Sequence, residues 1–164
     1  MILRARDLMQ KNVSTVSADM SLSDFANFLD DEGIHGAPVL GSDGHVIGVA
    51  SYTDLIREVS EEEREGNHNY FRVSDYGSGE YEGEALNLDA DFHGSNRLVS
   101  EIMTIELVMA EEETTAGELA STMMERGVHR VLIGTEGVLS GIITSSDLLK
   151  AVKKYEEFCT TKNT

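Results

Sequence analysis

Two short segments of the chain carry a glycine, a hydroxyl side chain and a carboxylate at steps of three residues. These residues are Gly48, Ser51 and Asp54 in the first segment, and Gly141, Thr144 and Asp147 in the second. Glycine lets a backbone run close to a ligand. A hydroxyl near a helix start can hydrogen-bond a phosphate beside free backbone N–H groups. An ionised carboxylate can accept two hydrogen bonds at once, which suits a vicinal ribose diol.

A second interpretation of both segments is purely structural. A carboxylate shortly after Ser or Thr is also an ordinary helix cap. Thr53 and Ser146 add a further hydroxyl to each segment. In a single copy the pattern would favour the cap, so the organisation of the whole chain has to decide between the two.

An internal repeat organises the chain. Three groups of residues recur after 94 positions, and the segments around Asp54 and Asp147 recur after 93, so the second copy is one residue shorter near Gly44. The matched pairs are Asp7-Leu8-Met9 with Glu101-Ile102-Met103, Ser21-x-x-Asp24-Phe25-Ala26 with Thr115-x-x-Glu118-Leu119-Ala120, and Gly33-Ile34-His35 with Gly127-Val128-His129.

Each copy predicts the same order of elements. Ser21 with Asp24, and Thr115 with Glu118, are helix-start patterns. The apolar residues that follow at helical spacing are Leu22, Phe25, Ala26 and Leu29, and in the second copy Leu119, Ala120, Met123 and Met124. Gly33 and Gly127 suit left-handed helix ends. Strands are expected at 37–40 and 46–50, and at 131–133 and 138–143, giving strand–helix–strand–strand–helix.

The two copies resemble the CBS domain family, arranged as a tandem pair (a Bateman module). The resemblance covers about residues 7–60 and 98–155. It rests on the matched segments above and on Gly36-Ala37-Pro38-Val39 in the first copy. The second copy departs from the family pattern by having Leu132 where the first has Pro38.

The resemblance implies an α/β fold in which two β-α-β-β-α repeats pack as a pseudo-twofold pair with two clefts. It also implies binding of adenosine-containing ligands (AMP, ADP, ATP or S-adenosylmethionine), assembly as a homodimer, and regulation of a partner protein. No cofactor is required. In this family context the repeated Ser/Thr-x-x-Asp segments favour nucleotide contact over simple capping.

The resemblance places further residues at the ligand. His35 and His129 occupy equivalent positions in a region that lines the cleft in family members, followed by Gly36 and Arg130. Since only Arg130 offers a charge to a phosphate, the second-copy site is expected to bind a phosphorylated ligand better. The predicted nucleotide-binding residues are Thr144, Ser146, Asp147, His129, Arg130, Ser51, Thr53, Asp54, His35 and Gly36.

Composition excludes several classes of protein. The 164 residues hold 13 Lys and Arg against 30 Asp and Glu, a net charge of −17. This charge disfavours nucleic-acid binding and docking on an anionic membrane. No apolar run is long enough to span a bilayer, and the one cysteine, Cys159, fits a reducing compartment. A cytoplasmic location is therefore expected.

An acidic insert separates the copies. The sequence divides into a first repeat at 1–60, an insert at 61–97, a second repeat at 98–158 and a tail at 159–164, and the insert carries −7 of the net charge. Its Asp89, Asp91 and His93 could face one side of an extended segment and hold a metal. A solvated acidic loop is the favoured interpretation, and no metal site is predicted.

Three functions remain open. The leading one is a stand-alone regulatory module that senses an adenine nucleotide or adenosyl ligand and signals to a partner protein. The second is a ligand-independent interaction or dimerisation module with vestigial clefts. The third, an enzyme that uses the acidic insert with a metal, ranks last, because the sequence contains no recognisable catalytic motif.

Overall fold

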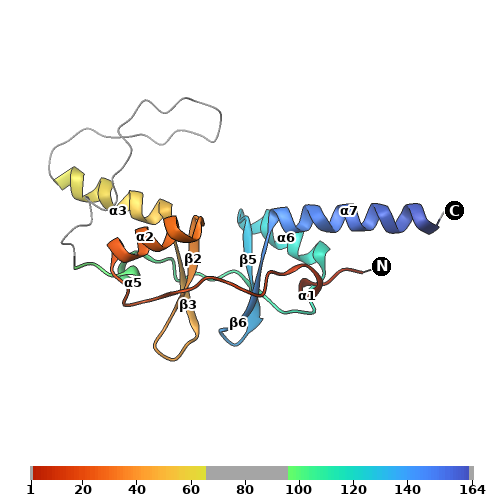
Figure 1. Ribbon diagram of the computed structural model, residues 1–164, viewed down its shortest axis with the longest axis horizontal. Helices are drawn as coiled ribbons and strands as arrows, with labels where there is room; N and C mark the ends of the chain where they lie inside the picture. The colour runs from red at the N-terminus through yellow and green to blue at the C-terminus, as the bar shows by residue number, and fades with distance from the viewer. Residues whose placement is uncertain (1, 66–95, 163–164) are drawn as a thin grey trace, which may run out of the picture. The chain divides into compact units, whose positions relative to one another are not determined.

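The computed structural model describes residues 2–65 and 96–162, and the side chains of all of these except 59–65 and 159–162 (Figure 1). The insert residues Asp89, Asp91 and His93 lie outside this range. The chain forms two compact units. Unit 1 consists of Met1–Ser14, Leu40–Ile47 and Ile105–Thr164, and unit 2 of Thr15–Val39 and Gly48–Thr104.

Unit 2 is built around the elements of the first repeat. A three-stranded sheet runs in the order β1-β2-β3. The strands are β1 (Val16–Ser17), β2 (Gly36–Leu40) and β3 (Val46–Ser51), and the helices are α2 (Leu22–Glu32), α3 (Tyr52–Glu65) and the short α5 (Val99–Ile102). The turn that joins β2 to β3 groups with unit 1.

Unit 1 repeats this plan with the second copy. Its sheet has the order β4-β5-β6, in which β4 pairs parallel with β5 and β5 pairs antiparallel with β6. The strands are β4 (Met109–Ala110), β5 (Arg130–Thr135) and β6 (Val138–Thr144), and the helices are α1 (Ala5–Leu8), α6 (Ala116–Arg126) and α7 (Ser145–Lys162). The predicted β-α-β-β-α order is confirmed in both units.

The helix-start and helix-end predictions are also confirmed. The Ser21 hydroxyl accepts a hydrogen bond from the Asp24 amide at 3.1 Å, and the Thr115 hydroxyl accepts one from the Glu118 amide at 3.3 Å. Both helices end at a glycine in the left-handed region, Gly33 with φ 62° and Gly127 with φ 63°. A residue with a Cβ atom adopts that conformation only at a cost.

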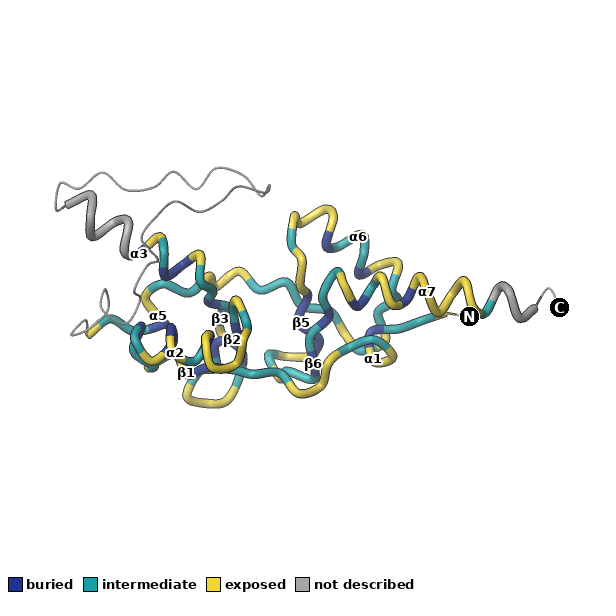
Figure 2. Tube along the Cα trace, turned by 45° about the horizontal axis from the view of Figure 1, so that its top comes forward, coloured by how far each residue is buried: buried dark blue, intermediate teal, exposed yellow. Residues whose placement is uncertain are grey.

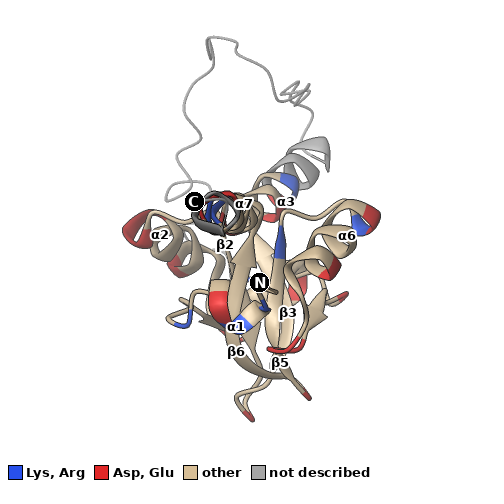
Figure 3. Ribbon diagram, turned by 90° about the vertical axis from the view of Figure 1, so that its right-hand side faces the viewer, with Lys and Arg blue, Asp and Glu red and all other residues tan. Residues whose placement is uncertain are grey.

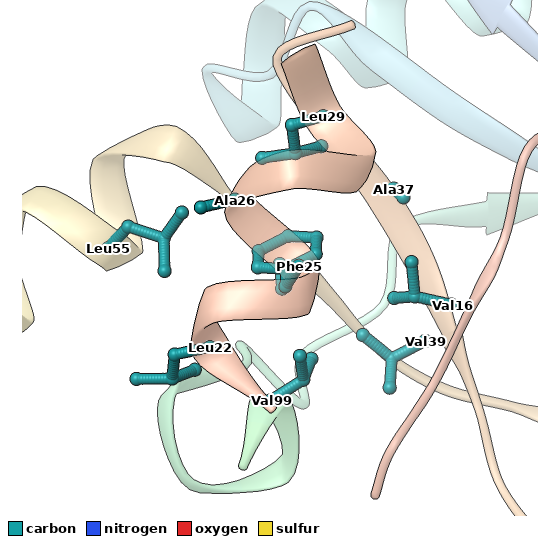
Figure 4. Packing of buried hydrophobic residues seen from close by; sticks show 10 residues of the cluster. Val16, Leu22, Phe25, Ala26, Leu29, Ala37, Val39, Leu55 and Val99 are labelled. Carbon is teal, nitrogen blue, oxygen red and sulfur yellow. The ribbon is translucent and has the colours of Figure 1, made fainter. Parts of the chain in front are cut away.

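The core of unit 2 is where the apolar spacing of α2 placed it. Phe25 and Leu29 of α2 are fully buried, together with Leu55 of α3 and Val99 of α5 (Figure 4). In unit 1 the buried cluster consists of Ala5, Leu119, Met123, Val131, Ile133 and Ile143. Ala5 comes from α1, so the segment that precedes the first repeat's helix in sequence packs into the core with second-repeat residues.

Met124 departs from the expected pattern. It follows Met123 in the predicted apolar set of the second copy, yet its side chain is exposed while that of Met123 is buried. Neighbouring residues on a helix point about 100° apart, and in α6 this step turns Met124 away from the face that buries Leu119 and Met123.

Candidate functional site

The two Ser/Thr-x-x-Asp segments lie where the last strand of each unit turns into its last helix. Ser51 ends β3 and precedes α3, and Thr144 ends β6 and precedes α7. The hydroxyl residue therefore stands at the N-cap position and the aspartate at the third helical position. This placement brings a hydroxyl, a carboxylate and the first N–H groups of a helix together in each unit.

In unit 1 the Asp147 carboxylate makes contacts through both of its oxygens. Its Oδ2 accepts from the Thr144 amide at 2.9 Å and from the Thr144 hydroxyl at 2.7 Å. Its Oδ1 lies 2.8 Å from the Lys150 ammonium, one helical turn along α7. Asp147 is only 2% exposed, so this carboxylate is buried but compensated by a positive charge.

A residue from far away in the sequence completes the surroundings of Asp147. The Gln10 amide group donates to Asp147 Oδ2 at 3.4 Å, at the long end of hydrogen bonding. The Gln10 backbone is fixed by two hydrogen bonds to Ile142 of β6, with N–O distances of 2.9 and 3.0 Å. The N-terminal segment therefore contributes a polar side chain to the second-repeat site.

The equivalent arrangement in unit 2 is similar but lacks that amide. Asp54 Oδ2 accepts from the Ser51 amide at 2.9 Å and the Ser51 hydroxyl at 2.7 Å. Arg57 lies 3.2 Å from Oδ1. Asp54 is 8% exposed. Thr104 occupies the position that matches Gln10 and pairs with Val49 through two backbone hydrogen bonds of 2.9 Å.

Both aspartates thus make the helix cap that the sequence offered as the structural interpretation. The cap uses Oδ2, and one cation lies on Oδ1. Since each carboxylate oxygen has two acceptor positions, Oδ1 retains capacity for a ligand hydroxyl beside its lysine or arginine. Capping and diol binding are therefore compatible at both sites.

The pKa of Asp147 reflects these contacts. Burial by itself raises the pKa of this carboxyl, but the hydrogen bond from Lys150 and those from the backbone and hydroxyl of Thr144 outweigh burial. The result is a pKa below the ordinary aspartate value. Asp147 is therefore an anion at neutral pH, which is the form that accepts hydrogen bonds from a diol.

This lowered pKa predicts an acid-dependent loss of stability. A carboxyl whose pKa is depressed by folding stabilises the folded state above its unfolded-state pKa of about 3.9, and that contribution disappears as the pH falls below this value. The Asp147→Asn variant lacks the titrating group. We expect its thermal midpoint to lie below that of the wild type at pH 7, and the gap to narrow at pH 3. A gap that is unchanged or wider at pH 3 would contradict this origin of stability.

The two histidines make equivalent backbone hydrogen bonds in the two units. The His35 carbonyl accepts from the Tyr52 amide, and the His129 carbonyl accepts from the Ser145 amide, both at 3.0 Å. Each histidine therefore lies beside the start of the last helix of its unit, with its side chain exposed. The His35 ring also meets Tyr52 edge-on, with ring centres 6.3 Å apart.

Gly36 and Arg130 make the two sites chemically different. Arg130 is exposed and pairs with Thr144 in the antiparallel register of β5 and β6, so it lies on the strand next to the hydroxyl of the second-repeat site. At Gly36 a Cβ atom would lie 2.9 Å from the Ala50 carbonyl oxygen and 3.0 Å from Ser51 Cβ. The backbone of unit 2 therefore leaves no room for an arginine at the matching position.

The remaining predicted residues lie near the N-terminal ends of α3 and α7. Thr53 and Ser146 are exposed in the first turns of α3 and α7. Arg57 and Gln10 were not among the predicted residues. Arg57 could have been found from its i+3 spacing to Asp54, which places the two side chains on one helix face. Gln10 carries no such signal, because it meets Asp147 across 137 positions of sequence.

Comparison with known proteins identifies the family. The sequence matches the CBS domain over residues 5–61 and 99–154, one match for each repeat. The chain belongs to the CBS domain family. Two successive CBS domains form a pair, and the sites described above lie at the strand-to-helix junction of each.

Relatives match this CBS pair along most of its length. Uncharacterized protein MJ1426 of Methanocaldococcus jannaschii is 27% identical over 156 residues, which is 92% of each chain. The CBS domain pair of protein MJ0100, in complex with 5′-methylthioadenosine and S-adenosyl-L-methionine, has a TM-score of 0.67 at 17% identity and covers 94% of this chain and 99% of that one. CBSX2 in complex with AMP has a TM-score of 0.67 at 18% identity, covering 94% and 98%.

The described residues form neither a membrane-spanning helix nor a cluster of metal ligands. No helix there is both long and apolar enough to cross a membrane. Within the same part of the chain, no group of three or more His, Cys, Asp or Glu side chains is arranged to hold a metal ion.

Proposed function

We propose that this CBS pair is a regulatory module that binds an adenosine-containing ligand, such as AMP, ADP, ATP or S-adenosylmethionine, and signals its presence to a partner protein. The observation that carries the proposal is the buried, ionised Asp147 at a helix start, in contact with the Thr144 hydroxyl and Lys150, with Arg130 paired to Thr144 on the adjoining strand. The carboxylate suits a ribose diol, while the hydroxyl and cations suit a phosphate.

The ligand acts by differential binding in this proposal. A ligand that contacts one arrangement of the protein more tightly shifts the population toward it, and a partner then reads that arrangement. The protein performs no chemistry on the ligand, needs no cofactor, self-associates as a homodimer and works in the cytoplasm. Ligand-bound CBS pairs of the same fold support the ligand class.

A thermal-shift screen with AMP, ADP, ATP and S-adenosylmethionine tests the proposal. A ligand at 100 times its dissociation constant stabilises a protein by about 2.7 kcal/mol. For a chain of this size, that corresponds to a rise of roughly 5–10 °C in thermal midpoint. The absence of any shift with all four compounds at millimolar concentration would rule out the proposed function.

One observation favours the alternative of a ligand-independent interaction module. Both aspartates are already engaged by a cap and a cation, so a protein that used them only to hold α3 and α7 would look the same at these contacts. That alternative predicts partner binding that does not respond to any of the four ligands. A pull-down from lysate, without ligand and with each of the four compounds in turn, separates the two functions.

Gln10 provides a sharper test of the second-repeat site. Replacing Gln10 with Ala removes a donor beside Asp147 at an exposed position, so folding should change little. We expect AMP affinity to fall about 3- to 10-fold, the effect of losing one weak hydrogen bond of about 1 kcal/mol at the site. The matched control is Thr104→Ala, at the equivalent position of unit 2. Isothermal calorimetry showing the same affinity for both variants would exclude Gln10 from the site.

A further inference from the structure

The start of α3 differs from the start of α7 in the residue that follows the N-cap hydroxyl. This residue is Tyr52 in the first repeat and Ser145 in the second. The Tyr52 hydroxyl donates a hydrogen bond to the Asp30 carboxylate near the C-terminal end of α2. Tyr52 is half-buried and Asp30 is exposed, and Figure 2 shows exposed and buried segments alternating along α3. The first-repeat site therefore has an aromatic ring and an acid beside its helix start.

The contacts of Tyr52 hold the end of α2 close to the start of α3. While its hydroxyl reaches Asp30, its amide donates to the His35 carbonyl at 3.0 Å, just beyond the end of α2. The hydrogen bond to Asp30, together with burial and the charge of Asp30, raises the pKa of Tyr52 to about 12. The phenol is therefore protonated at neutral pH and keeps donating to Asp30.

The end of α2 is strongly acidic. Its last three residues are Asp30, Asp31 and Glu32, and the sequence of α2 contains no Lys or Arg. The C-terminal end of a helix itself carries partial negative charge. Figure 3 shows Asp and Glu in red on α2, whereas α6 has a blue segment beside a red one. A phosphate at the first N–H groups of α3 meets the negative potential of this helix end.

The second repeat has different chemistry at the equivalent positions. Met124 stands where the first repeat has Asp30, and the charges of Glu125 and Arg126 after it cancel. The Ser145 hydroxyl lies 3.8 Å from a methionine sulfur of α6. The second repeat also has an arginine on its adjoining strand, where the first has no room for one. The surroundings of the second-repeat site therefore favour a phosphate, and those of the first oppose one.

We propose that the first-repeat site selects adenosine ligands whose 5′ group carries no phosphate and is uncharged or cationic, with Asp30 and Tyr52 as the specificity-determining residues. This inference rests on the proposed function and gives each repeat its own ligand class. A thioether or a sulfonium group packs favourably on an aromatic ring such as that of Tyr52. Asp30 attracts a sulfonium cation and repels a phosphate. The Asp54 carboxylate accepts the ribose hydroxyls that both ligand classes share.

Calorimetry with 5′-methylthioadenosine and AMP tests this selection, because the two compounds share adenosine and differ only at the 5′ group. Asp147→Asn weakens the second-repeat site and so reports on the first, while Asp54→Asn does the reverse. We expect 5′-methylthioadenosine to bind about tenfold tighter than AMP in Asp147→Asn, and the order to reverse in Asp54→Asn. S-adenosylmethionine should follow the order of 5′-methylthioadenosine.

Substitutions of the acid and the tyrosine test which residues select. In the Asp147→Asn background, Asp30→Asn should narrow the preference for 5′-methylthioadenosine about 2- to 5-fold, the effect of one exposed charge. Tyr52→Phe should narrow it in the same direction, because it keeps the ring but releases Asp30. Asp24→Asn is the matched control, since it removes the same charge at the other end of α2.

A transplant into the second repeat provides the reciprocal test. Met124→Asp combined with Ser145→Tyr, in the Asp54→Asn background, places the same two side chains at the equivalent positions of α6 and α7. AMP affinity should fall, while the affinity for 5′-methylthioadenosine should stay the same or rise. A merely structural disturbance of the site would lower both affinities together.

The outcomes separate this inference from the proposed function. Failure of all three compounds to bind the wild type overturns both. The same preference in Asp147→Asn and Asp54→Asn keeps ligand sensing but overturns the separate ligand classes. A preference that Asp30→Asn leaves unchanged, or that Asp24→Asn changes equally, overturns the role given to Asp30 and Tyr52.

Discussion

Replacing Asp147 with Asn is expected to lower the affinity for AMP at least tenfold while the protein stays folded. The asparagine side-chain oxygen can still accept from Thr144 and hold the cap, so the start of α7 survives. What disappears is the negative charge that holds Lys150 and that, in the proposed function, accepts hydrogen bonds from ribose hydroxyls. Hydrogen bonds to a charged group contribute about 1.5–3 kcal/mol each, which corresponds to tenfold or more in affinity.

The matched variant Asp54→Asn makes this experiment a comparison of the two sites. Asp54 forms the same cap with Ser51 and the same kind of ion pair, with Arg57. It lacks an arginine neighbour on the adjoining strand, because Gly36 replaces Arg130 and its backbone has no room for a side chain. Calorimetry should therefore show a smaller loss of AMP affinity for Asp54→Asn. Equal losses would contradict the ranking, and no loss in either variant would assign both aspartates to capping alone.

The elements of both units could be predicted from local sequence, because each depends on neighbouring residues. Phe25 and Leu29 follow a helical spacing, and Ser21 and Gly33 mark the ends of that helix. The paired strands are predictable to within about one residue at most of their ends, since a glycine turn separates each pair. Because the sequence is repeated, each element is predicted twice, once from each copy.

The candidate site was predictable only in part, because its residues come from different distances along the chain. Thr144, Asp147 and Lys150 belong to one strand–helix junction, so a local pattern predicts them as a group. Gln10 reaches Asp147 only because the backbone of the N-terminal segment pairs with Ile142 of β6. No spacing in the sequence encodes that pairing. The same limit explains why Ala5 was not predicted to pack in the core of unit 1.

The capping role of the two aspartates could be predicted from the sequence, but its relation to ligand contact could not. Sequence alone offered capping and ligand contact as alternatives, whereas the geometry of Asp147 permits both through different oxygens. The same few residues can therefore both stabilise the start of the helix and present a charged group. This is why removing the charge while keeping the shape, as in Asp147→Asn, is more informative than truncation to alanine.

Replacing Phe25 with Ala is expected to destabilise the protein by about 3–5 kcal/mol, the largest effect we predict for a single substitution. Phe25 is fully buried in unit 2 between Leu22, Leu29 and Val99, which come from α2 and α5 (Figure 4). Truncation removes the ring's contacts and leaves a cavity that the surrounding sheet and helices fill only partly.

Urea unfolding at pH 7 measures this loss, with Asn27→Ala as the control on the exposed side of the same helix. The control should change the free energy of unfolding by no more than about 0.5 kcal/mol. Val99 belongs to the segment after the insert, so the ring of Phe25 links residues from both ends of the insert into one core. Loss of the ring should therefore also loosen α5, seen as faster hydrogen exchange at the Val99 and Met103 amides, which bond to the Met20 and Val99 carbonyls. A Phe25→Ala variant within about 1 kcal/mol of the Asn27→Ala control would show that this core is not packed as the structure has it.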